Sequence, residues 1–449
     1  MSPREPKSDQ RERLLNGMAQ VVGRRGYPET TIALVIAQAG VSRSTFYEHF
    51  TDKEDCFLAA FENLAPLLLD ELKAIVGGAS WGEKQAAVLN FVFDPAHSDL
   101  ADSWRLLLTH ARAGTPRIRN ACHDLLGEIE LHVGEIRENV PTGLSTLDIA
   151  PKPLVGGIHS VLSLRRVKRE MDDPGEIFRA LLHWTSSYAV PHEHPRRDAA
   201  DWTRLGRGLL AARPEPPEEA ESNRPLPRGS AHLPASEVDQ EHHNRIVHAT
   251  ASLMRERGYA AITIADIVAA ASVSRGVFYK HFLNKREVFL AGQTLALQDG
   301  IGLVSAAYFA RASWPERLWY GLEALSGYLA STPDLAHLML IESYAAGSAA
   351  LERLTDSIRA LSVFLEEGYN QSPAAAKLSH VCSEAIAGAI HELIYDAAIR
   401  DRTARLPELV PQAAYICLAP FLGPLRARET VDELLQARLP GLCATGRPS

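Results

Sequence analysis

Two short stretches of this 449-residue chain carry the same hydrogen-bonding side chains at the same spacing. The first, at residues 41–50, reads VSRSTFYEHF, and the second, at 273–282, reads VSRGVFYKHF. Each contains an arginine, a tyrosine and a histidine, which can donate hydrogen bonds to base edges and phosphate oxygens. The sequence shows no glycine-rich phosphate loop, metal-ligand cluster or nucleophile elbow, so these residues favour nucleic-acid binding over catalysis. We therefore expect no enzyme activity, catalytic residue, metal or cofactor.

Each stretch must form a short helix that buries one face and exposes the other. Phe46 and Phe50 lie four residues apart and share the buried face, and Ser42 can cap the first turn. Residues 31–39 (TIALVIAQA) have the spacing of a preceding helix, which Gly40 can end in a left-handed conformation. This order of helix, tight turn and capped helix is the helix-turn-helix plan. The second copy repeats these features at 263–271, Ser274, Phe278 and Phe282, with Ser272 in place of the glycine.

The repeat extends beyond the two helices. Residues 26–59 and 258–291 match without a gap at 18 of 34 positions, at an offset of 232 residues. Their shared pattern, T-I-x-x-x-x-A-x-A-x-V-S-R-x-x-F-Y-x-H-F-x-x-K, resembles the DNA-binding domain of the TetR family of transcriptional regulators. The resemblance implies an all-helical ligand-binding and dimerisation domain behind each copy. It also implies an upstream helix at 11–26 and 244–258, and a long helix that starts near Lys53 and Lys285.

The second helix of each helix-turn-helix, called here the reader helix, is predicted to contact DNA. Arg43 and Arg275 are predicted to bond a base edge, most often guanine, with a solvated surface arginine as the alternative. The resemblance implies phosphate contacts for the tyrosine, the histidine and the downstream lysine of each copy. The histidines could instead serve helix packing, and the threonines cap a helix in either case. The full predicted DNA-binding set is Thr31, Ser42, Arg43, Ser44, Thr45, Tyr47, His49, Lys53, Thr263, Ser274, Arg275, Gly276, Val277, Tyr279, His281 and Lys285.

Charge distinguishes the two reader helices. The whole chain has a net charge of −8, although nucleic-acid-binding domains are often basic. Residues 274–287 carry four basic residues and one glutamate, a net of +3, whereas 42–55 carry two basic and four acidic residues, a net of −2. We therefore expect an imperfect palindromic operator on double-stranded DNA, with most of the affinity from the second reader helix.

The chain is predicted to be all-α, because no stretch shows sustained strand alternation. Five scattered cysteines, a polar N-terminus and the lack of a long apolar run predict a cytoplasmic protein with no membrane partner. The expected parts are a DNA-binding domain at 1–60, an effector and dimerisation domain at 61–212, a proline- and glutamate-rich linker at 213–241, a second DNA-binding domain at 242–292 and a second effector domain at 293–449.

The repeat persists in the effector domains, where VGGIH at 155–159 aligns with AGAIH at 387–391. Gly156, Gly157 and Gly388 lie inside predicted helices, where glycine costs up to about 1 kcal/mol relative to alanine. Close helix approach or a local kink would explain them, and the resemblance places the dimer interface here. Because a linker tethers the two halves, we predict an intramolecular pseudo-dimer. The alternative is a homodimer of chains with four reader helices.

The resemblance also implies a small apolar or amphipathic ligand, bound among the middle helices of each effector domain. Aromatic residues at helical spacing more often belong to a core, which is the alternative for each candidate. The candidates by position are Trp104, His110 and Trp184 in the first half, and Trp319, Tyr328, Glu342 and Tyr344 in the second.

Two further features have structural explanations that we favour. His192 and His194, in the sequence PHEHP, could suggest a metal site, but without a third ligand they are expected to be solvated. Cys56 lies near the first reader helix and could act as a redox sensor. Its equivalent is Val288, which instead indicates a small buried apolar residue.

Taken with the resemblance, these patterns predict a sequence-specific transcriptional regulator, a ligand-responsive repressor, with two reader helices per chain. The alternative is a ligand-sensing or interaction protein in which the first helix-turn-helix no longer binds DNA, as its acidic reader segment would explain.

Overall fold

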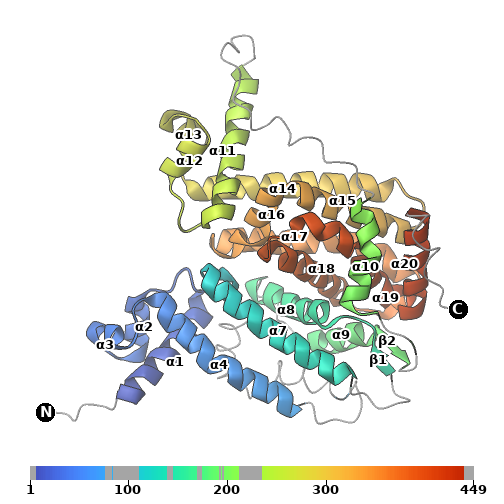
Figure 1. Ribbon diagram of the computed structural model, residues 1–449, viewed down its shortest axis with the longest axis horizontal. Coiled ribbons are helices and arrows are strands. Elements are labelled where there is room, and N and C mark those ends of the chain that lie inside the picture. Colours follow the sequence, from blue (N-terminus) through green and yellow to red (C-terminus); the bar gives the residue numbers. More distant parts are fainter. Residues whose placement is uncertain are drawn as a thin grey trace. The chain divides into compact units, whose positions relative to one another are not determined.

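The all-α prediction is confirmed. Apart from two three-residue strands, β1 (Ser145–Leu147) and β2 (Ala189–Pro191), the elements in the described part of the chain are helices. The computed structural model describes residues 7–75, 83, 111–138, 145–168, 174–191, 194, 197–211 and 235–438 (Figure 1).

The chain divides into two compact units whose limits differ from those of the two sequence repeats. The second unit contains the whole second repeat together with three segments from the end of the first. The first unit consists of Met1–Leu147, Leu162–Ser186 and Pro191–His194, and the second of Asp148–Val161, Ser187–Val190 and Pro195–Ser449. The domain limits drawn from the sequence therefore stay a prediction.

The first unit holds the first helix-turn-helix. Leu14, Phe46 and Phe57 are fully buried on α1, α3 and α4, which pack together. Its described helices are α1 (Lys7–Arg25), α2 (Ile32–Ala39), α3 (Arg43–His49), α4 (Lys53–Ile75), η3 (Ala111–Ala113), α7 (Pro116–Glu138) and α9 (Pro174–Ser186).

The second unit holds the second helix-turn-helix and a larger helical body (Figure 1). Helix α8 (Pro151–Lys168) begins in this unit and ends in the first. The remaining helices are α10 (Ala199–Ala211), α11 (Ala235–Arg257), α12 (Ile264–Ala270), α13 (Arg275–His281), α14 (Lys285–Phe309), α15 (Trp314–Ser331), α16 (Pro333–Leu340), η5 (Glu342–Tyr344), α17 (Ser348–Leu361), η6 (Ser362–Asn370), η7 (Ala375–Lys377), α18 (Val381–Ile399), η8 (Thr403–Leu409), α19 (Val410–Leu422) and α20 (Pro424–Arg438).

The tight turn before each reader helix uses a left-handed residue. Gly40 has φ 63°, and its N–H bonds to the carbonyl oxygen of Ile36. Ser272 occupies the equivalent position with φ 52°, although a side chain makes this conformation unfavourable. The serine therefore retains the turn that the glycine adopts in the first copy, at a cost in backbone strain.

One hydrophobic core joins the second DNA-binding domain to the effector helices. Phe278 of α13 and Met254 of α11 are fully buried in the same cluster as Leu338 of α16 and Ala350 of α17. Because the cluster is continuous, a shift of α16 must be accommodated by the helices that carry the second reader helix.

Within the second unit, the start of α8 packs closely against α18. A Cβ atom added at Gly156 would overlap the Glu392 side chain, and one added at Gly388 would overlap Ser160. Close helix approach therefore explains these two glycines. Beside them, the Lys152 ammonium lies 2.8 Å from the Asp396 carboxylate, in a pair whose side chains are mostly buried.

A buried carboxylate anchors the segment that precedes α8. Asp148 is 1% exposed, accepts a hydrogen bond from the Tyr415 hydroxyl at 3.0 Å, and is paired with the Arg428 guanidinium. Nearby, Arg197 forms a two-bond pair with Asp432, with both distances 2.7 Å. A buried charge is tolerated only when it is paired in this way, so these contacts specify how the segment docks on α19 and α20.

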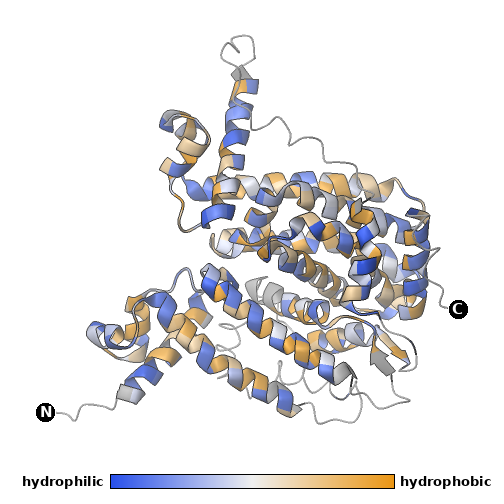
Figure 2. Ribbon diagram, viewed as in Figure 1, coloured by the Kyte–Doolittle hydropathy of each residue, from blue (hydrophilic) through white to orange (hydrophobic). Residues whose placement is uncertain are grey.

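Two helix starts agree with the sequence and two lie farther upstream than expected. Helix α1 begins at Lys7 and not at residue 11. Helices α4 and α14 begin at Lys53 and Lys285, as expected. Helix α11 begins at Ala235, inside the stretch predicted as linker, and not near residue 244. The added turns are rich in charged and polar residues (blue in Figure 2), so apolar periodicity could not reveal them.

Substitutions at the two left-handed turn residues, Gly40 and Ser272, should change the local stability of their turns in opposite directions. Gly40→Ala meets no neighbouring atom within 4 Å, so its cost is conformational, about 1 kcal/mol. Ser272→Gly should stabilise the second turn by about 0.5–1 kcal/mol, because relief of strain exceeds the extra chain entropy. Amide hydrogen exchange in α2–α3 and α12–α13 measures both local free energies. A loss of protection in Ser272→Gly would contradict the expectation.

Candidate DNA-binding site

The second reader helix, α13, presents its polar face to solvent. Ser274 caps it, accepting a hydrogen bond from the N–H of Val277 at 3.2 Å. Phe278 and Phe282 hold the opposite face in the core, at 0% and 4% exposure. Tyr279 is 53% exposed, and the predicted contacts Arg275, Gly276 and Val277 lie on the outer side of the same short helix.

The first reader helix, α3, has the same construction. The Ser42 hydroxyl accepts from the N–H of Thr45 at 3.1 Å and lies 2.7 Å from the Ser44 hydroxyl. The guanidinium of Arg43 lies over the Tyr47 ring, 5.8 Å from its centroid. Stacking of this kind orients an exposed arginine without removing its hydrogen-bond donors. Thr31 and Thr263 cap the preceding helices, as expected.

In each copy, an arginine holds the turn before the reader helix in place. This role was not predicted from the sequence. Arg13 donates to the carbonyl oxygen of Gly40 at 3.0 Å. Its equivalent, Arg245, donates to the carbonyl oxygens of Ala271 and Ser272 at 2.9 and 3.0 Å. The only available signal was that both copies carry arginine at this position. Each guanidinium ties the first helix of the domain to the turn that aims the reader helix.

The two lysines predicted to contact phosphate are partly committed to the protein. Lys53 donates to the Tyr27 carbonyl oxygen at 3.0 Å, and Lys285 donates to those of Tyr259 and Ile262 at 2.6 and 2.9 Å. Each ammonium also lies over the ring of its tyrosine, 4.1 and 4.4 Å from the centroid. Burial lowers the pKa of both lysines. An ammonium has three N–H donors, so a phosphate contact would have to use a donor that the main-chain oxygens do not already occupy.

The two histidines turn one ring nitrogen inward. The Nε2 atoms of His49 and His281 are buried and have no hydrogen-bond partner among the described residues. Burial is also the main reason that the pKa of His281 lies below its usual value, which favours a neutral ring at pH 7. This placement agrees with helix packing, while a phosphate contact through the other nitrogen stays a prediction.

The charge of the second reader helix is lower than its own sequence indicates. Lys280 forms an ion pair with Asp239 of α11, at 2.6 Å, from outside the counted segment. Lys285 faces main-chain oxygens, as described above. Arg275 and Arg286 therefore carry most of the positive charge that this segment can offer to DNA.

Glu342 connects the effector body to the second DNA-binding domain. It is 1% exposed, and one carboxylate oxygen accepts the N–H of Tyr259 at 2.7 Å. The other oxygen lies 3.4 Å from Nε2 of His337. Tyr259 is also the residue whose ring and carbonyl oxygen hold Lys285. Glu342 thus contacts the turn that supports the reader helix.

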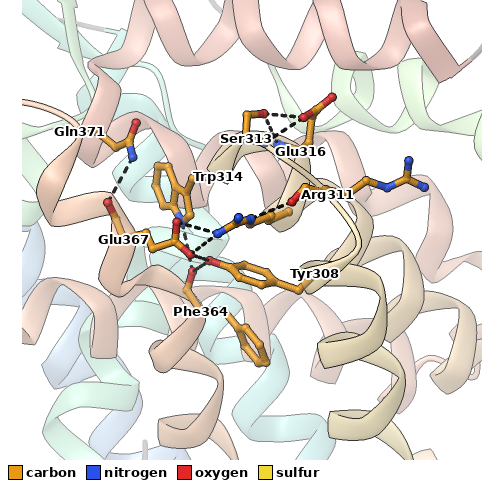
Figure 3. Close-up of polar contacts among 9 residues, drawn as sticks. Tyr308, Arg311, Ser313, Trp314, Glu316, Phe364, Glu367 and Gln371 are labelled. Carbon is orange, nitrogen blue, oxygen red and sulfur yellow. Dashed lines mark hydrogen bonds and ion pairs between the residues drawn. The ribbon is translucent and has the colours of Figure 1, made fainter.

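An apolar cavity lies in the second effector body, between α14, α15, η6 and α18. Its volume is about 50 Å³. One edge carries polar groups: the Tyr308 hydroxyl donates to the carbonyl oxygen of Phe364 at 3.2 Å and to Glu367 at 3.0 Å (Figure 3). Arg317 bonds the same carboxylate at 2.8 Å. Residues that line the cavity include Val304, Tyr308, Gly321, Leu325, Phe364 and Ile390.

None of the four residues predicted to bind a ligand in the second half is among those that line this cavity. Trp319 and Tyr328 are buried core residues of α15, and Tyr344 packs edge-on against Tyr395. In the first unit Trp184 is fully buried, whereas Trp104 and His110 lie outside the described residues. Sequence reasoning missed the cavity because aliphatic side chains and one glycine form most of it.

Cys56 and His194 both lie within the described residues. Cys56 is fully buried, and burial raises the pKa of its thiol to about 12, so the reactive thiolate is disfavoured. His194 is exposed, and His192 lies outside the described residues.

The fold and this site define a helix-turn-helix DNA-binding protein with two reader helices. The family model described as bacterial regulatory proteins, tetR family, matches residues 14–60 and 246–291, which are the two domains built above. The chain is a TetR-family transcriptional regulator in which the family's unit is duplicated. No curated protein matches the chain.

Solved structures that resemble the chain match about one half of it. The fatty acid degradation regulator FadR from Bacillus halodurans is 20% identical over 39% of this chain and 94% of its own, with a TM-score of 0.37. A gamma-butyrolactone receptor (ArpA-like protein) is 20% identical over 44% and 99%, with a TM-score of 0.36. The TetR-family regulator PfmR from Thermus thermophilus is 23% identical over 44% and 98%, with a TM-score of 0.31.

None of the helices in the described ranges is long and apolar enough to cross a membrane.

Removal of the base-reading arginine should weaken specific binding most. Arg275→Ala is expected to lower affinity for the operator about 10- to 100-fold and to relax the preference at one base position. Arg43→Ala, in the acidic reader segment, should lower the operator affinity by a smaller factor. Fluorescence anisotropy on an operator series with single base changes measures both effects. Arg311→Ala, an exposed arginine of the effector body, is the control. A loss in Arg275→Ala that is equal on every sequence would contradict base reading.

Proposed function

We propose that this regulator is a ligand-responsive repressor whose single chain supplies both reader helices for one imperfect palindromic operator. The observation that carries the proposal is the presence of two complete helix-turn-helix domains, each with an exposed arginine and tyrosine on a capped reader helix. Double-stranded DNA is the partner that such faces suit. Access to chromosomal DNA places the protein in the cytoplasm.

The proposed ligand is small and amphipathic. The cavity walls are apolar, and at one edge the hydroxyl of the lining residue Tyr308 donates to the Glu367 carboxylate (Figure 3). Arg317 bonds the same carboxylate. A ligand with an apolar body and a hydrogen-bonding end would match both regions.

The route from ligand to DNA is proposed to pass through α16 and Glu342. Leu338 of α16 touches the start of α14 at Gly292, and Glu342 holds the N–H of Tyr259. A ligand that spreads α14 and α15 would act on these contacts, and the continuous core would pass the shift to α13. The free energy of DNA binding can then weaken by at most the difference in ligand-binding free energy between the DNA-binding arrangement and the shifted one.

Pairing of the two halves within one chain is proposed to replace the dimer of single units. Support comes from the second unit, where Gly156 and Gly388 allow close approach of α8 and α18, and Asp148 docks on Tyr415 and Arg428. These contacts join residues of the first repeat to residues of the second. The short tether gives such contacts an effective concentration in the millimolar range, which favours pairing within a chain.

The mass in solution decides between the two assemblies. The full chain, dilute and without DNA, is expected to have the mass of one chain, 49.2 kDa, by light scattering. Gly388→Leu, whose side chain would overlap Ser160, should leave each reader helix folded but lower operator affinity at least 10-fold. A mass near twice the chain mass would contradict the pseudo-dimer. Retained affinity in Gly388→Leu would show that this helix contact does not align the readers.

Filling the cavity should abolish ligand binding without touching DNA contacts. A Cβ atom added at Gly321 has its nearest neighbour at 3.5 Å, so Gly321→Ala fits, whereas Gly321→Leu would extend into the empty space. The apolar dye anilinonaphthalene sulfonate is the probe. Its fluorescence enhancement should fall at least fivefold in Gly321→Leu and stay near wild type in Gly321→Ala. Equal dye binding in all three proteins would rule this cavity out as the ligand site.

A further inference from the structure

Three potential metal ligands meet beside the second reader helix. Asp239 and His242 lie three residues apart on α11 and so share one face of that helix. His281 is the last residue of α13, which lies against α11 (Figure 1). One ligand atom from each of the three side chains lies within 4.8 Å of the other two.

We propose that Asp239, His242 and His281 bind a divalent transition-metal ion, of which Zn²⁺ is the best match. Two imidazole nitrogens and a carboxylate oxygen form a donor set that suits Zn²⁺, Ni²⁺ and Co²⁺. Zinc bonds of about 2.0–2.1 Å require ligand atoms about 3.3 Å apart in a tetrahedron, so each side chain would move inward by at most about 1 Å. Water fills the fourth position.

His281 is prepared for coordination by its surroundings. Its Nε2 atom is buried and has no hydrogen-bond partner in the described structure. His49 carries the same buried nitrogen in the first copy, so what distinguishes His281 is its position beside Asp239 and His242.

The ion must compete with a lysine. The ammonium of Lys280 bonds both carboxylate oxygens of Asp239, at 2.6 and 2.7 Å. The Lys280 side chain is 60% exposed, so it can turn into solvent when the metal binds. Exposed pairs of this type are weak, so this one presents a small barrier to metal binding. The displaced ammonium is then available to DNA phosphate.

The ligand set exists only in the second copy. At the repeat offset, Asp239 and His242 correspond to Lys7 and Gln10, and His281 corresponds to His49. One potential ligand of three therefore occurs at these positions in the first copy. The site distinguishes the two DNA-binding domains more sharply than their charges do.

Metal binding would join the first turns of α11 to the end of the reader helix. These turns otherwise meet α13 through the Lys280 pair and through His242 and His243, whose ring centroids lie 6.4 and 6.0 Å from that of His281. An ion bound to both helices would restrict the motion of α13 relative to α11. The metal would thereby make the second reader helix more rigid before DNA binds.

Cobalt absorption and zinc titration of the tag-free full-length chain test the site. Wild type is expected to give the intense visible bands of four-coordinate Co²⁺, and Zn²⁺ should displace the cobalt. His242→Gln and Asp239→Asn should each weaken Co²⁺ binding at least 10-fold, while His380→Gln, at an exposed histidine elsewhere, should match wild type. Circular dichroism verifies that each variant is folded. Absent bands in wild type, or unchanged affinity in both ligand variants, would overturn the proposal.

Hydrogen exchange tests the link between the helices. Zinc should slow amide exchange in α13 at least fivefold in wild type and leave it unchanged in His242→Gln. Zinc binding without added protection of α13 would overturn the joining of α11 to α13. Neither measurement contains DNA, so the result is independent of whether the proposed repressor function holds.

Discussion

The contact between a partly buried lysine and a tyrosine is the interaction on which the position of each reader helix depends. In both copies the ammonium lies over a tyrosine ring and donates to the carbonyl oxygen of the same tyrosine, Tyr27 for Lys53 and Tyr259 for Lys285. Each lysine is also the first residue of the long helix that leads to the effector domain. The contact therefore ties that helix to the turn between the first two helices. Removal from water lowers the lysine pKa, and the ring and the carbonyl oxygen offset that cost.

What the sequence could predict is governed by distance along the chain. The caps at Ser42 and Ser274 were predictable because each hydroxyl bonds an N–H three residues away. The contact of Arg13 with the turn spans 27 residues, and that of Glu342 with Tyr259 spans 83. Periodicity and local chemistry contain no information on such pairs, since tertiary packing brings them together. The charge count for the second reader helix left out Asp239 for the same reason, because Asp239 lies 41 residues from Lys280.

The candidate ligand residues show a different limit. Trp319 and Tyr328 recur at helical spacing, and the same spacing describes a core and a pocket equally well. Both side chains are buried, and a ligand role for either stays a prediction. A cavity arises where volume is lacking, as at Gly321, and that depends on how neighbouring helices fill the space. Residue types in the sequence therefore do not show where the packed helices leave a cavity.

The ion pair between Lys152 and Asp396 has a consequence for how the two repeats can change over time. At the repeat offset its mirror image would join Glu384 to Leu164, which cannot form an ion pair. In a symmetric dimer of identical chains each contact occurs twice, so every substitution alters both sides at once. Here the contact occurs once, and each side is encoded separately. Fusion thus releases the two surfaces from self-complementarity. They are free to become a matched, unlike pair that a second copy of either repeat would fit poorly.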